Sequence, residues 1–302
     1  MAESASMRPS PTAYPALARP QRSWWQDTVR QFRRNQLAVV GLIIVLGLIL
    51  VAIFAPQIAP YDPTEQHLAD KRMPPGAKYW LGADEFGRDI FSRILYGTRI
   101  ALLVGGLAVL IATGVGLLFG TIAGYLGGLA DEVIMRLTDV LLAFPYLLLA
   151  IAIVTALGAS VVNTTLAVGI WGAPSFIRIV RASVLTVKER DFVLAARAVG
   201  VPASRLIVRH LVPNFIAPVA VYATLFMAQA ILVEAALSFL GLGVQPPQPS
   251  WGLMVATGRN FISVAPHVAT MPGLAILIAV LGFNLLGDGL RDALDPRLRH
   301  AM

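Results

Sequence analysis

Long uncharged stretches alternate with short polar ones along the chain, and the uncharged stretches are long enough to cross a membrane. A helix needs about 20 mostly apolar residues to span the hydrocarbon core, because lipid offers no partners for exposed backbone groups. The pattern predicts six such helices, at residues 37–55, 100–130, 140–157, 164–177, 211–233 and 268–287. The third and fourth are separated by small and polar residues at 158–163, which favour a turn.

A further uncharged stretch, residues 235–258, is not expected to cross the membrane. It contains GLGVQPPQPSWG, in which three prolines and two glutamines interrupt the apolar residues. Proline removes a backbone donor and breaks a regular helix, so this stretch predicts an irregular loop outside the lipid.

Composition agrees with an integral membrane protein, because 57% of the 302 residues are hydrophobic and only 14% are charged. An even number of spans places both chain ends on one side. With both ends in the cytoplasm, 17 of the 24 Lys and Arg residues lie inside, as the positive-inside rule requires. Since these residues are spread through loops, the net charge of +7 does not indicate nucleic-acid binding.

The N-terminal 36 residues are basic and contain several prolines, and they are too long for the positive end of a cleaved signal. They predict a cytoplasmic tail before an uncleaved anchor helix, with the first 20 residues disordered. Residues 23–36 favour a helix at the lipid headgroups. The chain has no cysteine and no HExxH or paired Cys/His motif, so we expect neither a disulfide nor a metal site.

Four glycines recur every fourth residue in the second predicted span. Gly116, Gly120, Gly124 and Gly128 would share one helix face, where the missing side chains let another backbone approach closely. We expect a packing face there, with a hinge or pathway wall as the alternative. Gly105 is expected to lie off this face.

A charged segment, DFVLAARAVGVPASRLIVRHLVPN at 191–214, lies between two predicted spans and on the cytoplasmic side of the predicted topology. Its apolar residues recur at helical spacing until Gly200, and Pro202 prevents continuation. A second helical stretch follows and leads into the next span at Pro213. An amphipathic helix this short is marginal alone, so its apolar face should rest on a partner or on its own membrane domain. The alternative is a solvated loop on the headgroups.

This segment resembles the cytoplasmic loop of ABC importer permeases, whose pattern is Glu-Ala-Ala, three residues, Gly, nine residues, Ile-x-Leu-Pro. Leu194, His210 and Val212 depart from the pattern, in the variant associated with peptide permeases. The stretches LGADEFGRDIFSRILYGTRIALLVG, DVLLAFPYLLLAI and EAALSFLGLGVQPPQPSWG are also similar to the second, C-type permease of peptide importers. The resemblance assigns ATPase coupling to Asp191, Ala195, Ala196, Gly200, Arg205, His210 and Pro213.

The resemblance implies an all-α membrane protein with the type I ABC importer permease architecture, in the bacterial cytoplasmic (inner) membrane. Its partners would be membrane lipid, a second homologous permease, two cytoplasmic ATPase subunits and an extracytoplasmic binding protein that delivers dipeptides or oligopeptides. Relatives also carry nickel chelates or glutathione. The chain has no Walker A glycine loop, so we expect it to be non-catalytic and to bind no cofactor, with ATP hydrolysed by its partners. The rival is an autonomous secondary transporter, which would need ionisable residues in spans that contain essentially none.

These expectations divide the chain into a cytoplasmic tail (1–36), an anchor (37–56), an extracytoplasmic segment (57–98), a five-span core (99–290) with its coupling loop (186–213), and a cytoplasmic tail (291–302). A surface helix at 84–97 should turn Ile90, Ile94 and Leu95 inward and Asp89 and Arg93 outward. It either docks the binding protein or packs structurally. Glu234 follows a 23-residue uncharged run, so it either lines the pathway or lies at the outer interface.

Overall fold

The structure is a computed structural model that describes residues 24–294, so the expectations for residues 1–23 and 295–302 lie outside the described residues. All regular elements within 24–294 are helical. They are α1 (Trp24–Arg34), α2 (Gln36–Ile58), η1 (Leu68–Asp70), α3 (Ile90–Leu126), α4 (Gly128–Ala143), α5 (Tyr146–Leu157), α6 (Val161–Val187), α7 (Asp191–Ala198), α8 (Ala203–Leu206), the π-helical turn η2 (Ile207–Leu211), α9 (Val212–Phe239), α10 (Trp251–Gly258), η3 (Arg259–Phe261) and α11 (His267–Leu294).

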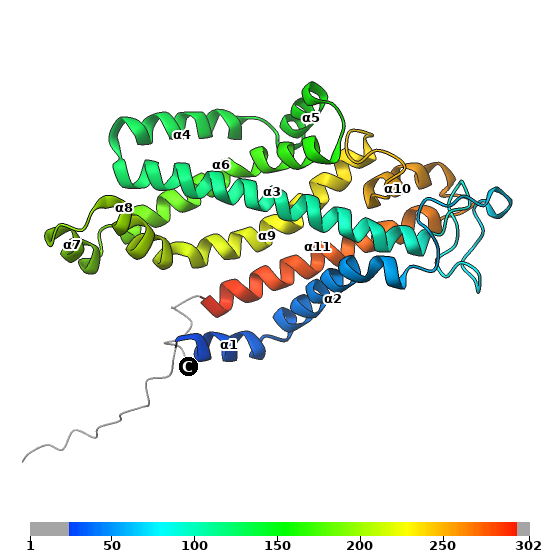
Figure 1. Cartoon of the computed structure of the whole chain (residues 1–302), viewed down its shortest axis with the longest axis horizontal. Helices are drawn as coiled ribbons and strands as arrows, with labels where there is room; N and C mark the ends of the chain where they lie inside the picture. The colour runs from blue at the N-terminus through cyan, green and yellow to red at the C-terminus, as the bar shows by residue number, and fades with distance from the viewer. Residues whose placement is uncertain (1–23, 295–302) are drawn as a thin grey trace, which may run out of the picture.

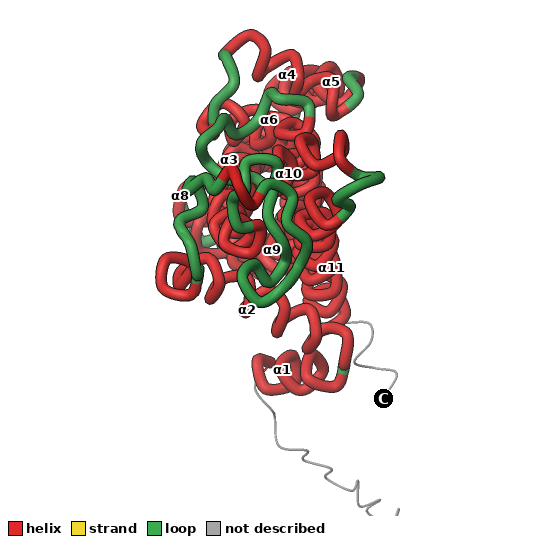
Figure 2. The backbone as a smooth tube through the Cα atoms, turned by 90° about the vertical axis from the view of Figure 1, so that its right-hand side faces the viewer, coloured by secondary structure: helices red, strands yellow, loops and turns green. Residues whose placement is uncertain are grey.

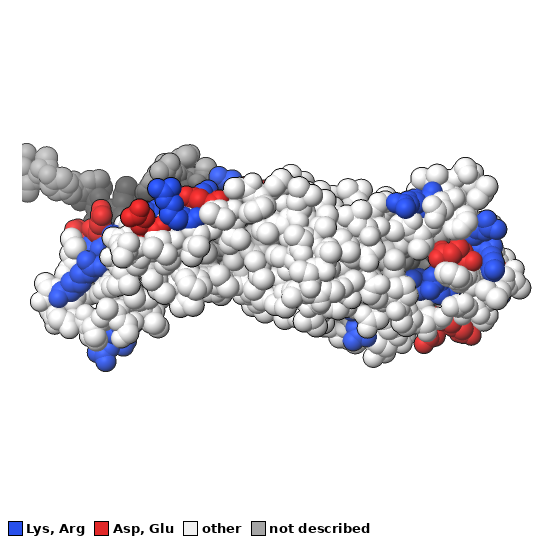
Figure 3. All heavy atoms as spheres, turned by 90° about the horizontal axis from the view of Figure 1, so that it is seen from above, with Lys and Arg blue, Asp and Glu red and all other residues white. Residues whose placement is uncertain are grey.

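The long helices run along the longest axis of the molecule and pack side by side when viewed down that axis (Figures 1 and 2). One end carries α7 and α8, and the other carries the irregular segment 59–89 and α10 (Figure 1). We call these the α7 end and the opposite end. Charged side chains gather at both ends on the face shown in Figure 3, and an uncharged band separates them. This distribution is that of a protein held across a bilayer.

Five of the described helices are long and apolar enough to cross a membrane, and a bent pair of helices raises the number to six. The all-helical class and the span count therefore agree with the sequence prediction. The five are α2, α3, α6, the continuous stretch Ala203–Phe239 and α11.

The third span differs from the straight helix that the sequence predicts. The chain forms α4 and α5 instead, which meet at an angle of 93°. The break falls at Phe144 and Pro145, since proline lacks a backbone donor and disfavours helical geometry at the residue before it. The sequence contains this proline, but the prediction relied on the uncharged stretch around it and therefore missed the break.

The predicted surface helix at 84–97 is also different, because its second half is the beginning of α3. Asp89 caps this 37-residue helix by accepting a hydrogen bond from the Ser92 backbone N–H at 2.8 Å. Ile90 is buried as expected, but Asp89 and Arg93 are buried too, with Arg93 only 3% exposed. The prediction that these two point outward is wrong, because the 59–89 segment folds over them and the Pro63 carbonyl accepts a hydrogen bond from Arg93 Nη1 at 2.9 Å.

Three of the four ladder glycines line the contact between α3 and α6. A Cβ on Gly116 would overlap Phe176, and one on Gly120 would lie 2.7 Å from the Ile177 carbonyl oxygen. Gly124 is similarly close to α6. Gly128 does not belong to this face, because α3 ends at Leu126 and Gly128 begins α4 with a φ of +54° and open space around its Cβ position.

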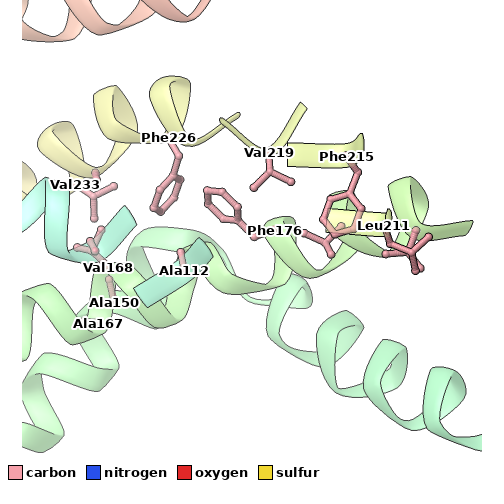
Figure 4. Close-up of a cluster of buried hydrophobic side chains, with 14 of the residues drawn as sticks. Ala112, Ala150, Ala167, Val168, Phe176, Leu211, Phe215, Val219, Phe226 and Val233 are labelled. Carbon is pink, nitrogen blue, oxygen red and sulfur yellow. The ribbon is translucent and has the colours of Figure 1, made fainter. Parts of the chain in front are cut away.

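The main core lies where α3, α5, α6 and α9 meet. Its buried side chains include Phe176, Phe215, Val219 and Phe226, which face one another between α6 and α9 (Figure 4). The same cluster continues to the α7 end through Val193, so the short helices there are packed onto the spans.

Candidate docking segment at the α7 end

The segment that the sequence marks as a docking element connects α6 to α9 at one end of the molecule (Figure 1). Helix α6 reaches Val187, well beyond the predicted limit of the span at Ile177. Arg178 and Arg181 therefore belong to the span helix and not to the loop. Residues 188–202 connect α6 to the continuous helical stretch Ala203–Phe239.

Gly200 ends α7 in the manner that the sequence predicts. Its φ is +79°, which L side chains rarely adopt. The Gly200 N–H donates to the Arg197 carbonyl at 2.9 Å, and the Val201 N–H donates to the Ala196 carbonyl at 3.1 Å. These two bonds form a Schellman motif and satisfy carbonyls at the helix end. Open space surrounds the Cβ position of Gly200, so the backbone conformation is what requires glycine there.

One face of α7 is buried and the other carries exposed apolar side chains. Val193 is fully buried, and Ala196 packs against the same core cluster. Phe192, Leu194 and Val199 are exposed, with 80% of Val199 accessible. Ala195 is exposed beside them. The turn therefore presents an apolar surface away from its own membrane domain, and we call Phe192, Leu194, Ala195, Ala198 and Val199 the α7 surface.

Two basic side chains fasten the turn to the end of α3. The Arg197 guanidinium lies over the Tyr125 ring, 5.2 Å from its centroid. Lys188 Nζ donates to the Gly124 carbonyl at 3.0 Å. A displacement of α7 would therefore be transmitted to α3 as well as to the two spans that the turn connects.

The second half of the segment is continuous with α9. Leu206 and Leu211 are fully buried and hold α8 and η2 onto the bundle, while Arg205 is exposed. The half-buried His210 offers its carbonyl to Asn214 Nδ2 at 2.7 Å. Pro213 is the second residue of α9 and directly follows the π-helical turn η2. Of the residues assigned to coupling, Asp191, Ala195, Gly200 and Arg205 face outward, whereas Ala196 and His210 are partly covered.

An apolar groove of about 450 Å³ lies beside this turn, between the last turns of α3 and the beginning of α9. Its lining combines residues of α3 with residues of α8 and η2, among them Tyr125, Ala203 and Ile207. The groove thus shares Tyr125 with the contact that anchors α7.

Glu234 lies near the last turn of α9 and is buried by the chain's own residues. The side chain is 1% exposed, and its Oε1 accepts hydrogen bonds from Ser238 Oγ at 2.7 Å and Ser250 Oγ at 3.0 Å. Ser238 Oγ also accepts from the Val244 N–H. Glu234 therefore fixes the loop after α9 against that helix. Part of the predicted irregular stretch is helical, because α9 continues to Phe239 and α10 begins at Trp251.

The sequence analysis missed two ion pairs between α4 and α6. Arg181 Nη2 donates to Asp131 Oδ2 at 2.6 Å, and Arg178 Nη2 donates to Asp139 Oδ1 at 2.6 Å. Both arginines lie in the part of α6 that follows the predicted span, which ends at Ile177, and both aspartates lie in α4. No group of three or more potential metal-ligating side chains occurs among residues 24–294.

Comparison with known proteins identifies the family of this chain. Residues 116–300 match the family model described as the binding-protein-dependent transport system inner membrane component. Residues 23–75 match the N-terminal TM domain of oligopeptide transport permease C. The two matches together cover α1, α2, η1, the last eleven residues of α3 and all described elements after it.

Three curated relatives are similar over almost their whole length. The dipeptide transport system permease protein of Alkalihalophilus pseudofirmus is 48% identical over 275 residues, which cover 91% of this chain and 90% of the relative. The di/tripeptide transport system permease protein of Pseudomonas aeruginosa is 45% identical over 304 residues, 98% and 99% of the two chains. The glutathione transport system permease protein of Pectobacterium atrosepticum is 44% identical over 279 residues, 92% and 93%. The chain belongs to the inner membrane permease components of binding-protein-dependent ABC importers.

Proposed function

We propose that this chain is one of two permease subunits of an ATP-driven importer of short peptides, and that the α7 surface docks on a cytoplasmic ATPase subunit. The observation that carries the proposal is the exposed apolar face of α7, held at the end of the molecule by a Schellman turn and two contacts with α3. An exposed apolar surface at this position is unfavourable in water unless a partner covers it.

The proposed orientation puts the α7 end in the cytoplasm. Helix α1 lies toward that end, where Gln31 Nε2 donates to the Asp292 carbonyl of α11 at 2.9 Å. The described beginning and end of the chain therefore lie close together and on the α7 side (Figure 1). Both ends on one side agree with the even number of spans. The excess of Lys and Arg in the segments predicted to be cytoplasmic agrees with that side being the cytoplasm.

Energy would enter through the docked helix. In the proposal this chain has no nucleotide site of its own, and two ATPases hydrolyse the ATP. A second permease completes the transporter, and an extracytoplasmic binding protein delivers the substrate. An ATPase can shift the permease between two conformations only by contacting the α7 surface differently in its two nucleotide states. The buried Val193 and Leu206 would pass that difference to α6 and α9.

Short peptides are the substrate class that the relatives favour. Two of the three relatives described above are named for dipeptides or di/tripeptides, and the third for glutathione, which is itself a tripeptide derivative. Nickel chelates remain the alternative cargo from the sequence analysis.

The test is co-purification combined with labelling. A tagged chain expressed with its cognate ATPase should retain that ATPase after mild detergent extraction. A cysteine introduced at Ser204, in a chain without other cysteines, should react with an impermeant thiol reagent only after the cells are opened. A chain that never retains the ATPase, or a Ser204→Cys variant labelled in intact cells, would contradict the proposal.

A further inference from the structure

Five aromatic side chains from α5, α6 and α9 form a continuous row inside the molecule. The ring centroids of Tyr146 and Trp171 are 5.3 Å apart, and those of Trp171 and Phe226 are also 5.3 Å apart. Phe176 extends the row, at 5.4 Å from Phe226 and 4.8 Å from Tyr222. These separations lie within the range of attractive ring–ring contacts.

The row crosses the middle of the membrane-spanning helices. Trp171 is about 15 Å from the start of α6, and Tyr222 is about 15 Å from the start of α9, at 1.5 Å of rise per residue. Gly172 makes room for the row, because a Cβ there would overlap the Phe226 ring. The rings therefore lie well away from both charged ends of the molecule. Tyrosine and tryptophan in membrane proteins are usually found near such ends, at the membrane–water interfaces.

The members of the row differ in burial according to their chemistry. Phe176 and Phe226, which have no polar atom, are almost completely buried. Tyr146, Trp171 and Tyr222 remain partly exposed, with 51% of Tyr146 accessible. None of the three polar tips forms a side-chain hydrogen bond with another described residue. A hydroxyl or an indole N–H without a partner is unfavourable in hydrocarbon, so these three polar tips should face water or a polar ligand and not lipid tails.

We propose that the partly exposed side chains of Tyr146, Trp171 and Tyr222 contact the transported peptide at the middle of the translocation pathway. The rings would stack on apolar or aromatic side chains of the peptide. The tyrosine hydroxyls and the tryptophan N–H would exchange hydrogen bonds with its backbone amides, which are present whatever the side chains. The identification of the ligand rests on the proposed peptide-import function, but the predicted exposure to water does not.

The first experiment measures that exposure without any assumption about the substrate. Trp171→Cys and Tyr222→Cys are each introduced into the cysteine-free chain, which is assembled with the second permease and the two ATPases. The complex is treated with a small hydrophilic methanethiosulfonate, with and without a non-hydrolysable ATP analogue. The control is Leu46→Cys, near the middle of the exposed face of the anchor helix α2. We expect both row cysteines to react in at least one nucleotide state and the Leu46 position to stay unreactive. Failure of both row cysteines to react in either state would overturn the proposal.

The second experiment tests contact with the peptide. Tyr146→Phe, Tyr222→Phe and Trp171→Phe keep a ring but remove the polar tip, and Trp80→Phe is the matched control at the opposite end. Each row variant should raise the KM for peptide uptake about fivefold, the effect of one lost hydrogen bond of ordinary strength, with ATPase association unchanged. Unchanged KM in all three row variants, in a complex that imports peptides, would overturn the proposal. If the wild-type complex keeps its ATPase but imports no peptide, the proposed substrate is wrong, and the labelling result alone decides whether the row lines the pathway.

Discussion

Substitution of single glycines on α3 separates the effect of helix packing on stability from the effect of helix propensity. Gly116 and Gly114 are both interior to α3 and only two residues apart. A Cβ on Gly116 would overlap Phe176 of α6, whereas a Cβ on Gly114 meets no atom within 4 Å. Alanine improves intrinsic helix propensity by the same amount, about 1 kcal/mol, at either position, so the difference between the two variants reports on packing alone.

The size of this difference follows from the contact. Forcing extra atoms into a close-packed interface typically costs about 1 to 3 kcal/mol, because α3 and α6 must separate or Phe176 must leave its preferred rotamer. The Phe176 backbone also lies near the position that the alanine methyl group would take, so a side-chain rotation alone does not relieve the overlap. Gly116→Ala should therefore be less stable than Gly114→Ala by about 1 to 3 kcal/mol.

The assay is thermal unfolding of the purified variants in one detergent, followed by tryptophan fluorescence. One kcal/mol corresponds to a shift of about 2–4 °C in Tm for a domain of 150–250 residues. Gly105→Ala provides an intermediate case. Gly105 lies off the ladder face, as the sequence predicts, and packs against the flexible end of Met227 of α9, which can move aside. Equal Tm values for the Gly116 and Gly114 variants would refute the role of the ladder as a contact surface.

Two further predictions concern the buried carboxylate of Glu234 and the partly buried carboxylate of Glu85. Glu234→Ala would leave the Ser238 and Ser250 hydroxyls without their acceptor, at a cost of about 1 to 3 kcal/mol, whereas Glu234→Gln keeps an acceptor oxygen and should be milder; the Tm of the two variants checks the order, and equal losses would contradict it. Burial, and then the charge of Asp84, raise the pKa of Glu85. The protonated form is thus favoured on folding, and its stabilising contribution is lost as pH rises from the ordinary value of 4.5 through the raised pKa. Limited proteolysis of the 59–89 segment should show that Glu85→Gln is more resistant than wild type at about pH 8 but similar to wild type at about pH 4. The same difference in resistance between variant and wild type at both pH values would contradict this prediction.

The features that depend on one stretch of chain were readable from the sequence. The uncharged stretch from Leu37 to Ala55 became α2, and the Gly200 and Pro202 pair ended α7 where the pattern places the break. Such features depend on local hydrophobicity and on backbone conformations that only certain residues tolerate. The three packed ladder glycines also follow from the helical period, provided that the helix continues.

Features that depend on tertiary contacts were not readable in this way. Arg93 has the pattern of an exposed residue, yet the 59–89 segment covers it and Pro63 supplies the hydrogen-bond acceptor. Gly128 matches the period of the ladder, but Gly127 ends the helix before it. The sequence also did not show which face of α7 points outward. Helical spacing alone does not distinguish the face that packs on the chain's own spans from the exposed face.

The most direct test of the account is to place a charge on the α7 surface. Ala195→Asp and Val199→Asp add a carboxylate to the face proposed to be covered by the ATPase, where an unpaired buried charge is strongly unfavourable. Gln36→Asp adds the same charge at an exposed position outside the α7 surface, the first residue of α2, and serves as the control.

The measurement is the amount of ATPase that co-purifies with each variant, with peptide uptake in parallel. The account predicts equal insertion of all three variants, loss of ATPase and uptake for the two α7 variants, and retention of both for Gln36→Asp. Retention of ATPase and normal uptake in both α7 variants would contradict the claim that this helix receives the energy of ATP hydrolysis.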